Sequence, residues 1–137
     1  MAGKKFKLTG DRLPEWPNPD SSDIDHYLSK LHPANHSYVV LENDKGDFVQ
    51  CAGAKLVLVL EFHCKAKGKP IHFVLRKEAE LESTLSRVNC SCGPVQVHRN
   101  ERLDLNDAKV VFHEFFSTGK VSETFFRRDA TKELTWN

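Results

Sequence analysis

Residues 56–60, with the sequence Leu-Val-Leu-Val-Leu, constrain the fold of this chain more than any other segment. Five consecutive apolar residues, two of them β-branched, are typical of a strand that is buried on both faces. The residues that follow, through Cys64, extend the same pattern. The segment 56–64 is therefore predicted to form the central strand of a small sheet.

The segments on either side of this strand also have strand character. Residues 38–42, 48–52 and 71–76 are rich in β-branched and aromatic residues, and polar turn residues separate them. The first turn, residues 43–46, ends in a glycine that can take a positive φ. The middle of the chain is therefore predicted to be an antiparallel meander.

The second turn, at Lys67 and Gly68, also predicts the register of its hairpin. If these two residues are the central pair of a tight turn, residues at equal distances along the chain before and after the turn lie opposite each other. Phe62 then faces Phe73, and His63 faces His72. One face of the hairpin is expected to be apolar, and the other to carry both histidines.

Helical periodicity appears in three places. Apolar residues recur at helical spacing over residues 24–31 and, with three phenylalanines, over residues 104–118, which Gly119 ends. Residues 79–89 show the same spacing more weakly and are only a candidate for a short helix. Together these segments predict an α+β fold: an antiparallel β-meander sheet with two main helices packed on it, in two layers.

The length of 137 residues fits a single domain. Residues 1–22 contain Pro14, Pro17 and Pro19, each without an amide donor, so this segment is predicted to be a proline-rich extended arm. Residues 23–137 are expected to form the single α+β domain.

Charge and hydropathy exclude several classes of partner. The 20 basic and 19 acidic residues leave a net charge of +1, so no overall field attracts nucleic acid or an anionic membrane. No apolar stretch approaches the roughly 20 residues that cross a bilayer, and the basic N-terminus lacks the apolar region of a signal peptide. We expect a cytoplasmic protein, and therefore free thiols at Cys51, Cys64, Cys90 and Cys92.

Two groups of residues have the chemistry of a metal site. Cys90 and Cys92, with Cys64 and His63, offer thiolate and imidazole, but one residue between the thiols is less than the usual ligand spacing. His63 and His72 with Glu61 form a second candidate, in which Glu61 is a third ligand or a general base. Alternation along a half-buried sheet explains the histidines equally well, so we favour a structural role and expect no metal or cofactor.

No catalytic motif accompanies these candidates. The sequence has no nucleophile elbow, no glycine-rich phosphate loop and no distinct carboxylate pair, so we do not expect an enzyme. Arg127 and Arg128, followed by Asp129, are a candidate clamp for an anionic ligand. Adjacent arginines after aromatic residues more often cover apolar surface and pair with a nearby acid, which is the interpretation we prefer.

The order of the expected elements provides a further indication. An opening helix over residues 24–31 precedes a strand pair, 38–42 and 48–53, that ends in glycine, and a late helix ends with residues 115–119. Trp136 lies near the C-terminus. This order resembles the immunity proteins of bacterial polymorphic toxin systems, in particular those associated with deaminase-type toxins. The spacing between the late helix and Trp136 is longer than that pattern expects.

The resemblance implies a small cytoplasmic protein that binds one cognate toxin domain and neutralises it. Its partner would then be a protein, held by a few anchor residues inside a polar rim. The alternative is a protein that binds a metal or a small ligand through His63, His72 and the cysteines Cys64, Cys90 and Cys92.

Overall fold

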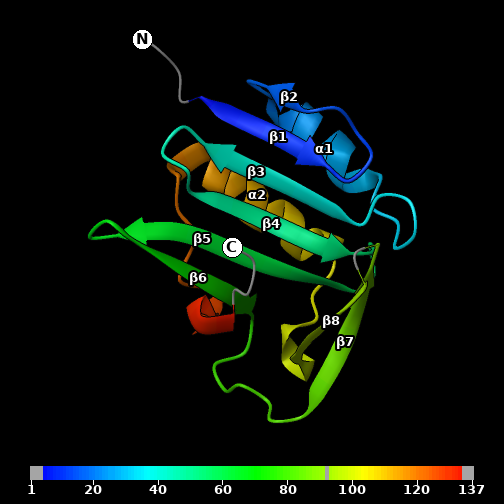
Figure 1. Cartoon of the computed structure of the whole chain (residues 1–137), viewed down its shortest axis with the longest axis vertical. Coiled ribbons are helices and arrows are strands. Elements are labelled where there is room, and N and C mark those ends of the chain that lie inside the picture. The colour runs from blue at the N-terminus through cyan, green and yellow to red at the C-terminus, as the bar shows by residue number, and fades with distance from the viewer. Residues whose placement is uncertain (1–4, 92, 134–137) are drawn as a thin grey trace.

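The computed structural model describes residues 5–91 and 93–133, and its main feature is an antiparallel sheet (Figure 1). Seven strands follow the order β2-β1-β3-β4-β5-β6-β9, and β7 pairs with β8 in a separate hairpin. The strands are β1 (Phe6–Gly10), β2 (Trp16–Pro17), β3 (Tyr38–Asn43), β4 (Phe48–Gly53), β5 (Leu58–Ala66), β6 (Lys69–Arg76), β7 (Leu85–Cys90), β8 (Gly93–His98) and β9 (Phe126–Asp129). The helices are α1 (Ser21–Ser29) and α2 (Leu105–Thr118), with short 3-10 turns η1 (Arg99–Glu101) and η2 (Thr131–Glu133). The α+β class and the antiparallel meander are therefore confirmed.

Strand β5 lies between β4 and β6, as expected for a central strand. It begins at Leu58 rather than at the start of the apolar run: Leu56 is 86% exposed and belongs to the loop before the strand. The predicted register of the second hairpin is correct, with Phe62 opposite Phe73 and His63 opposite His72. Its turn residues Lys67 and Gly68 both have positive φ, 53° and 79°.

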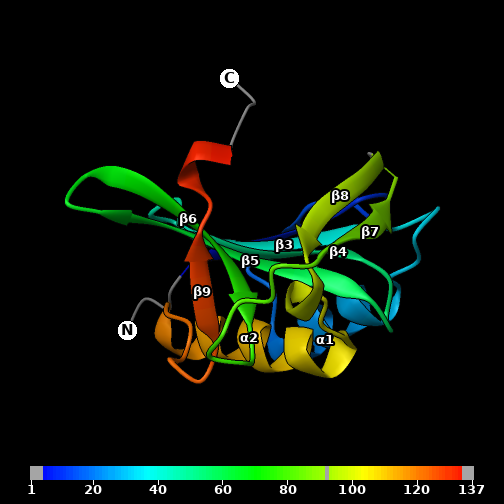
Figure 2. The same cartoon turned by 90° about the horizontal axis from the view of Figure 1, so that it is seen from below.

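Both helices pack against one face of the sheet (Figure 2). Each begins with a capping box, from Asp20 in α1 and from Asp104 in α2, which satisfies amide groups of the first turn. Helix α2 ends at Gly119, whose φ of 75° suits a residue without a side chain. The core between the layers contains Phe6, Leu8, Ile24, Leu28, Val39, Leu41, Val49, Cys51, Leu58, Leu60, Phe62, Leu75, Ala108, Val111, Phe112 and Phe115.

The opposite face of the sheet is covered only in part. The β7–β8 hairpin and η2 lie on this side (Figure 2). A second, smaller core forms beneath them from Val59, Val74, Val88, Val97 and Ala130. Successive residues of β5 therefore enter two different cores, which is the physical reason for a continuous apolar run.

Residues 79–89 do not form the candidate helix. Residues 77–84 have no regular structure, and Leu85–Cys90 is β7. The weak helical spacing is misleading here because Val88 and Cys90 are inward-facing residues of a strand with a period of two. Strand β8 supplies the hydrogen-bonding partner that makes the extended form stable.

Of the predicted arm, residues 1–22, the described residues 5–22 are part of the domain and not a separate arm, and residues 1–4 lie outside the described part. Phe6–Gly10 is β1, a strand inside the sheet that pairs with β2 on one side and β3 on the other. Phe6 and Leu8 alternate with exposed residues and enter the main core. Pro14 lies in the loop before β2, and Pro19 lies between β2 and α1. Pro17 occupies the edge strand β2, the position in a sheet that proline tolerates.

Two polar anchors hold the β7–β8 hairpin to the sheet. At its tip, Asp11 Oδ2 accepts hydrogen bonds from the hydroxyls of Ser37 and Ser91, at 2.9 and 2.6 Å. After its last strand, the fully buried Glu101 accepts two hydrogen bonds from Arg128 of β9, at 2.8 and 3.1 Å. The pKa of Arg128 is raised, chiefly by this hydrogen bonding to Glu101. The second anchor joins the hairpin to the far edge of the sheet.

We expect Glu101→Gln to destabilise the protein by about 3 kcal/mol, because it removes the buried partner of an ion pair and leaves the Arg128 guanidinium with only the exposed carboxylate of Glu133. Urea denaturation followed by circular dichroism measures the free energy of unfolding. Glu123→Gln, at an exposed position, is the control and should unfold like the parent protein. Equal stability of Glu101→Gln and the parent would contradict the anchoring role.

Candidate functional site: the open face of the sheet

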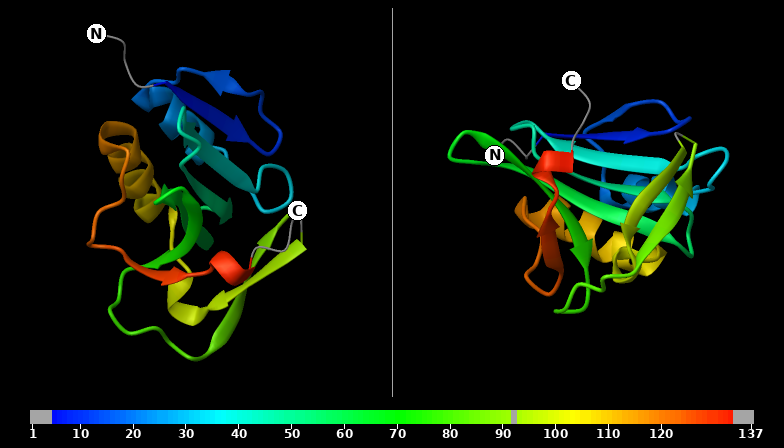
Figure 3. Two further views of the ribbon diagram at one scale, coloured as in Figure 1. Left: turned by 60° about the vertical axis from the view of Figure 1, so that its left-hand side comes forward. Right: turned by 60° about the horizontal axis from the view of Figure 1, so that its bottom comes forward.

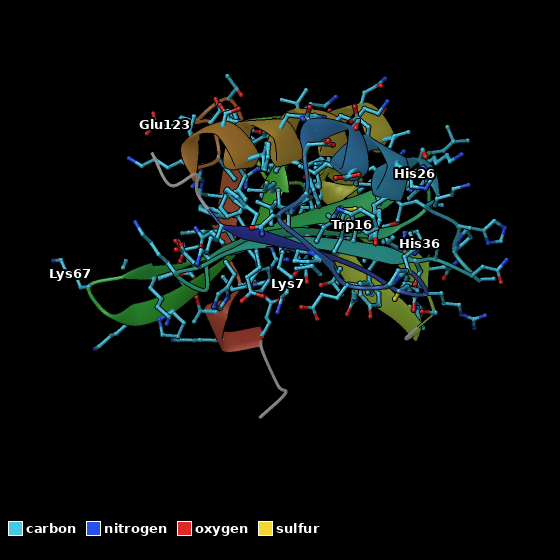
Figure 4. The ribbon with its side chains drawn as sticks, turned by 90° about the horizontal axis from the view of Figure 1, so that it is seen from above. Lys7, Trp16, His26, His36, Lys67 and Glu123 are labelled. Carbon is cyan, nitrogen blue, oxygen red and sulfur yellow. The ribbon has the colours of Figure 1, made fainter. Side chains whose placement is uncertain are left out.

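Neither the helices nor the β7–β8 hairpin covers the whole sheet (Figure 3). The uncovered part carries both polar and apolar residues. We call it the open face. Its centre comprises side chains of β1, β3, β4 and β5 that alternate with those of the main core: Lys7, Val40, Glu42, Phe48, Gln50, Glu61 and His63. Figure 4 shows Lys7 pointing away from the helices, toward this side.

A hydrogen-bonded network occupies the middle of the open face, with Glu61 at its centre. Gln50 Nε2 donates to Glu61 Oε1 at 3.1 Å, and His72 Nε2 bonds to the other carboxylate oxygen. His72 Nδ1 faces His63 Nδ1 at 3.1 Å. Phe48 stacks on the His63 ring, with the ring centroids 4.8 Å apart and nearly parallel. Three neighbouring strands thus contribute to one preorganised array.

The two histidines are more buried than strand alternation predicts. His63 is 9% exposed and His72 is 2% exposed, whereas we expected both side chains to point into solvent. Phe48 covers His63, and the backbone amide of His72 donates to Thr131 Oγ1 of η2 at 3.1 Å. Contacts from segments distant in sequence therefore bury a face that the local pattern marks as polar.

The contact between the two Nδ1 atoms limits the protonation of the pair. One nitrogen must carry a hydrogen and the other a lone pair, so full protonation of both rings breaks this bond. Burial, and next the charge of His72, lower the pKa of His63, while Asp47 opposes this shift. The carboxylate of Glu61 orients the ring of His72 through its Nε2 atom. The array therefore holds its shape best when His63 is neutral.

The structure separates the residues of the metal alternative. Cys64 packs against the main core on the helix side of the sheet, whereas His63 and His72 lie on the other side. Cys90 is disulfide-bonded, and Cys92 lies outside the described residues. Within residues 5–91 and 93–133, no three His, Cys, Asp or Glu side chains are arranged to hold a metal ion. The facing atoms of Glu61, His72 and His63 bond to one another instead.

The prediction of four free thiols is wrong for Cys90. Cys51 and Cys64 are free, and burial raises the pKa of the Cys51 thiol to about 12, so it behaves as a small apolar side chain. Burial also raises the pKa of Cys64. Cys90 lies at the end of β7, at the tip of the hairpin, and an expectation based on the cellular compartment takes no account of this local position.

Arg127 and Arg128 do not form an anion clamp, because adjacent residues of β9 point to opposite faces of the sheet. Arg127 lies over the rings of Phe62 and Phe73 on the helix side and donates to the carbonyl of Val121. Arg128 is held by Glu101 on the other side. Each arginine thus covers apolar surface or pairs with an acid, as preferred from the sequence.

Sequence reasoning missed two members of the array, Phe48 and Gln50. Both lie on β4, where Phe48 is opposite His63 and Gln50 is opposite Glu61. The register of β4 against β5 was the signal that would have found them. It was not available from the sequence because the connection between these strands is a loop without a recognisable two-residue turn.

Comparison with known proteins adds no assignment: no family model matches the chain, and no curated protein matches its sequence. Trp136, which entered the resemblance noted from the sequence, lies outside the described residues. None of the helices in the described part of the chain is long and apolar enough to cross a membrane. The site must therefore be interpreted from its own chemistry.

The protein should lose stability as the pH falls from about 7 to about 5, because burial lowers the pKa values of His36 and His63 below the unfolded value. The unfolded chain then binds more protons, and each such histidine reduces the free energy of unfolding by at most about 1.4 kcal/mol per pH unit. Urea denaturation at several pH values measures the slope.

His63→Gln should give a shallower slope than the parent protein over the same pH range. His26→Gln, at an exposed position of α1, is the matched control and should keep the parent slope. A slope unchanged by His63→Gln would show that this ring does not contribute to the pH dependence.

Proposed function

We propose that the protein acts by stoichiometric binding to another protein, as an immunity protein that binds and neutralises a cognate toxin domain. The open face is its candidate binding surface. The observation that carries the proposal is the Gln50–Glu61–His72–His63 array, in which the two buried histidines hold the half-buried Glu61, and Glu61 holds Gln50, in fixed positions on the open face.

Preorganisation is what makes this surface suitable for binding. Side chains that are already ordered lose little conformational entropy when a partner docks, so more of the contact energy is retained as affinity. Gln50 and His72 hold Glu61, and Phe48 lies flat on His63. Val40, half-buried beside Gln50 on β3, adds apolar area to the same surface.

The hydrogen bonds of the array fix its side chains. Each oxygen of Glu61 accepts a hydrogen bond, and both ring nitrogens of His72 are engaged. These groups hold one another in place, as expected for a recognition surface.

The order of the elements supports the immunity-protein part of the proposal. Helix α1, the β3–β4 pair that ends at Gly53, and α2, which ends at Gly119, follow one another as in the resemblance described from the sequence. The open face lies on the side of the sheet opposite these helices. A partner could therefore dock there without displacing the main core.

Val40→Arg is the test of this surface. It places a long cationic side chain at the centre of the open face and should weaken binding to the toxin at least about tenfold, the loss expected from disturbing an interface centre. The toxin to use is the product of the gene adjacent to that of this protein. Isothermal titration calorimetry measures affinity, and co-expression with the toxin domain measures protection of cells.

Val110→Arg is the matched control, because Val110 is 55% exposed on α2, on the helix side. It should bind and protect like the parent protein. Lys7→Glu, at an exposed position of the open face, provides a second test that does not disturb packing. Normal affinity of both open-face variants would exclude this surface as the binding site.

A further inference from the structure

The hairpin formed by β5 and β6 extends beyond the rest of the sheet and carries a concentration of lysines. Lys65, Lys67 and Lys69 occupy alternate positions around its turn, and residues 65–70 are all exposed. Lys67 lies at the tip of the hairpin, far from α1 and from the β7–β8 hairpin (Figure 4). The chain thus presents three cations on one projecting element.

The backbone that carries these lysines is ordered. Lys65 pairs with Pro70 and Ala66 pairs with Lys69, so the ladder continues to the turn. Positive φ values at Lys67 and Gly68 are those of the tight turn that suits the twist of a two-stranded hairpin. The positions of the three charges are therefore defined by the fold, although each side chain is free to move.

The lysines of the hairpin form no ion pair with the rest of the described chain. Residues 62–77 contain three lysines of the hairpin, Arg76 and Lys77, and no acidic residue. None of the ion pairs among residues 5–91 and 93–133 involves Lys65, Lys67 or Lys69. A groove of about 620 Å³ runs beside the turn, lined in part by Lys67, Lys69 and Lys132.

This hairpin is continuous with the open face. Lys65 is two residues beyond His63 on β5, and its backbone amide donates to Asp47 next to Phe48 of β4. A partner that contacts Phe48 would therefore extend toward Lys65, whereas Lys69, opposite Ala66, lies on the other face of the hairpin. We propose that the β5–β6 hairpin docks against an acidic surface of the protein partner, an inference that rests on the function proposed above.

The distribution of charge favours an acidic protein surface over a nucleic acid. Carboxylates lie close to the lysines: Asp47 at the base of the hairpin and Asp129 in the same groove as Lys69. The closely spaced phosphates of a nucleic acid would meet these carboxylates, whereas a protein surface carries separated charges. Residues 65–70 also contain no aromatic side chain on which a base could stack.

The lysines have a second possible use, since β9 pairs only with residues 73–76 and leaves the outer part of β6 as a free edge. Charged residues at such an edge prevent pairing with other chains. If this were their whole role, reversing their charge would leave binding of an acidic ligand unchanged.

The experiment compares two triple variants with equal net charge. The first reverses Lys65, Lys67 and Lys69 to Glu; the control reverses the exposed Lys55, Arg87 and Arg102 to Glu. The probe is a fluorescently labelled poly-L-glutamate of about 20 residues, measured by fluorescence anisotropy at low and physiological salt, where screening differs. A single-stranded oligonucleotide of equal charge is measured in parallel.

We expect the hairpin variant to bind poly-L-glutamate at least about tenfold more weakly than the parent protein, and the control to lose no more than about twofold. Equal losses in both variants, or unchanged binding by the hairpin variant, would overturn the inference. Tighter hairpin-dependent binding of the oligonucleotide would also overturn it, in favour of a nucleic-acid partner.

The same variants distinguish this inference from the proposed function. If calorimetry shows that the wild type and the hairpin variant bind the toxin equally well, the acidic docking surface is refuted, whereas the proposed immunity function is not. If the wild type forms no complex while poly-L-glutamate binding still depends on the hairpin, the immunity function fails and the anionic site stands. The melting temperature of each variant verifies that it is folded.

Discussion

Burial of β5 on both faces is the constraint on which the rest of the structure depends. Leu58 and Leu60 enter the core beneath the helices, and Val59 between them enters the second core beneath the β7–β8 hairpin. Burying each such side chain contributes roughly 1.5–3 kcal/mol, so neither layer can be removed without exposing part of this strand. The hairpin is therefore a structural necessity, and it also limits how much of the second face stays accessible.

The open face exists because this second layer is incomplete. Where the hairpin and η2 do not reach, the same strands carry Gln50, Glu61 and His63 in place of valine. These groups lie at the margin of an apolar core, where an unpaired polar atom costs folding free energy. They satisfy one another by hydrogen bonds. The ordered surface that we propose for binding is thus a direct consequence of the packing requirement. The lysines of the projecting hairpin extend it with charges that form no ion pair among the described residues.

Local patterns predicted the elements whose stability is local. The turn at Lys67 and Gly68 defined the register that places His63 opposite His72, because only two residues connect the strands. The apolar stripe of helix α2 and the end of this helix at Gly119 were equally predictable from the sequence. Residues 79–89 were only a candidate helix because their apolar spacing suits both a short helix and β7, and only pairing with β8 decides between them.

The sequence by itself determined the α+β class, the central strand, the main hairpin and the two helices, since these follow from periodicity and turn chemistry within short windows. Only the tertiary structure decided that Phe6 and Leu8 join the sheet, that Glu101 meets Arg128, and that the histidines are buried. These features join segments separated by many residues, and a contact between distant segments leaves no periodic signal in either one. The candidate site belongs to this second group, because it is assembled from residues of three strands.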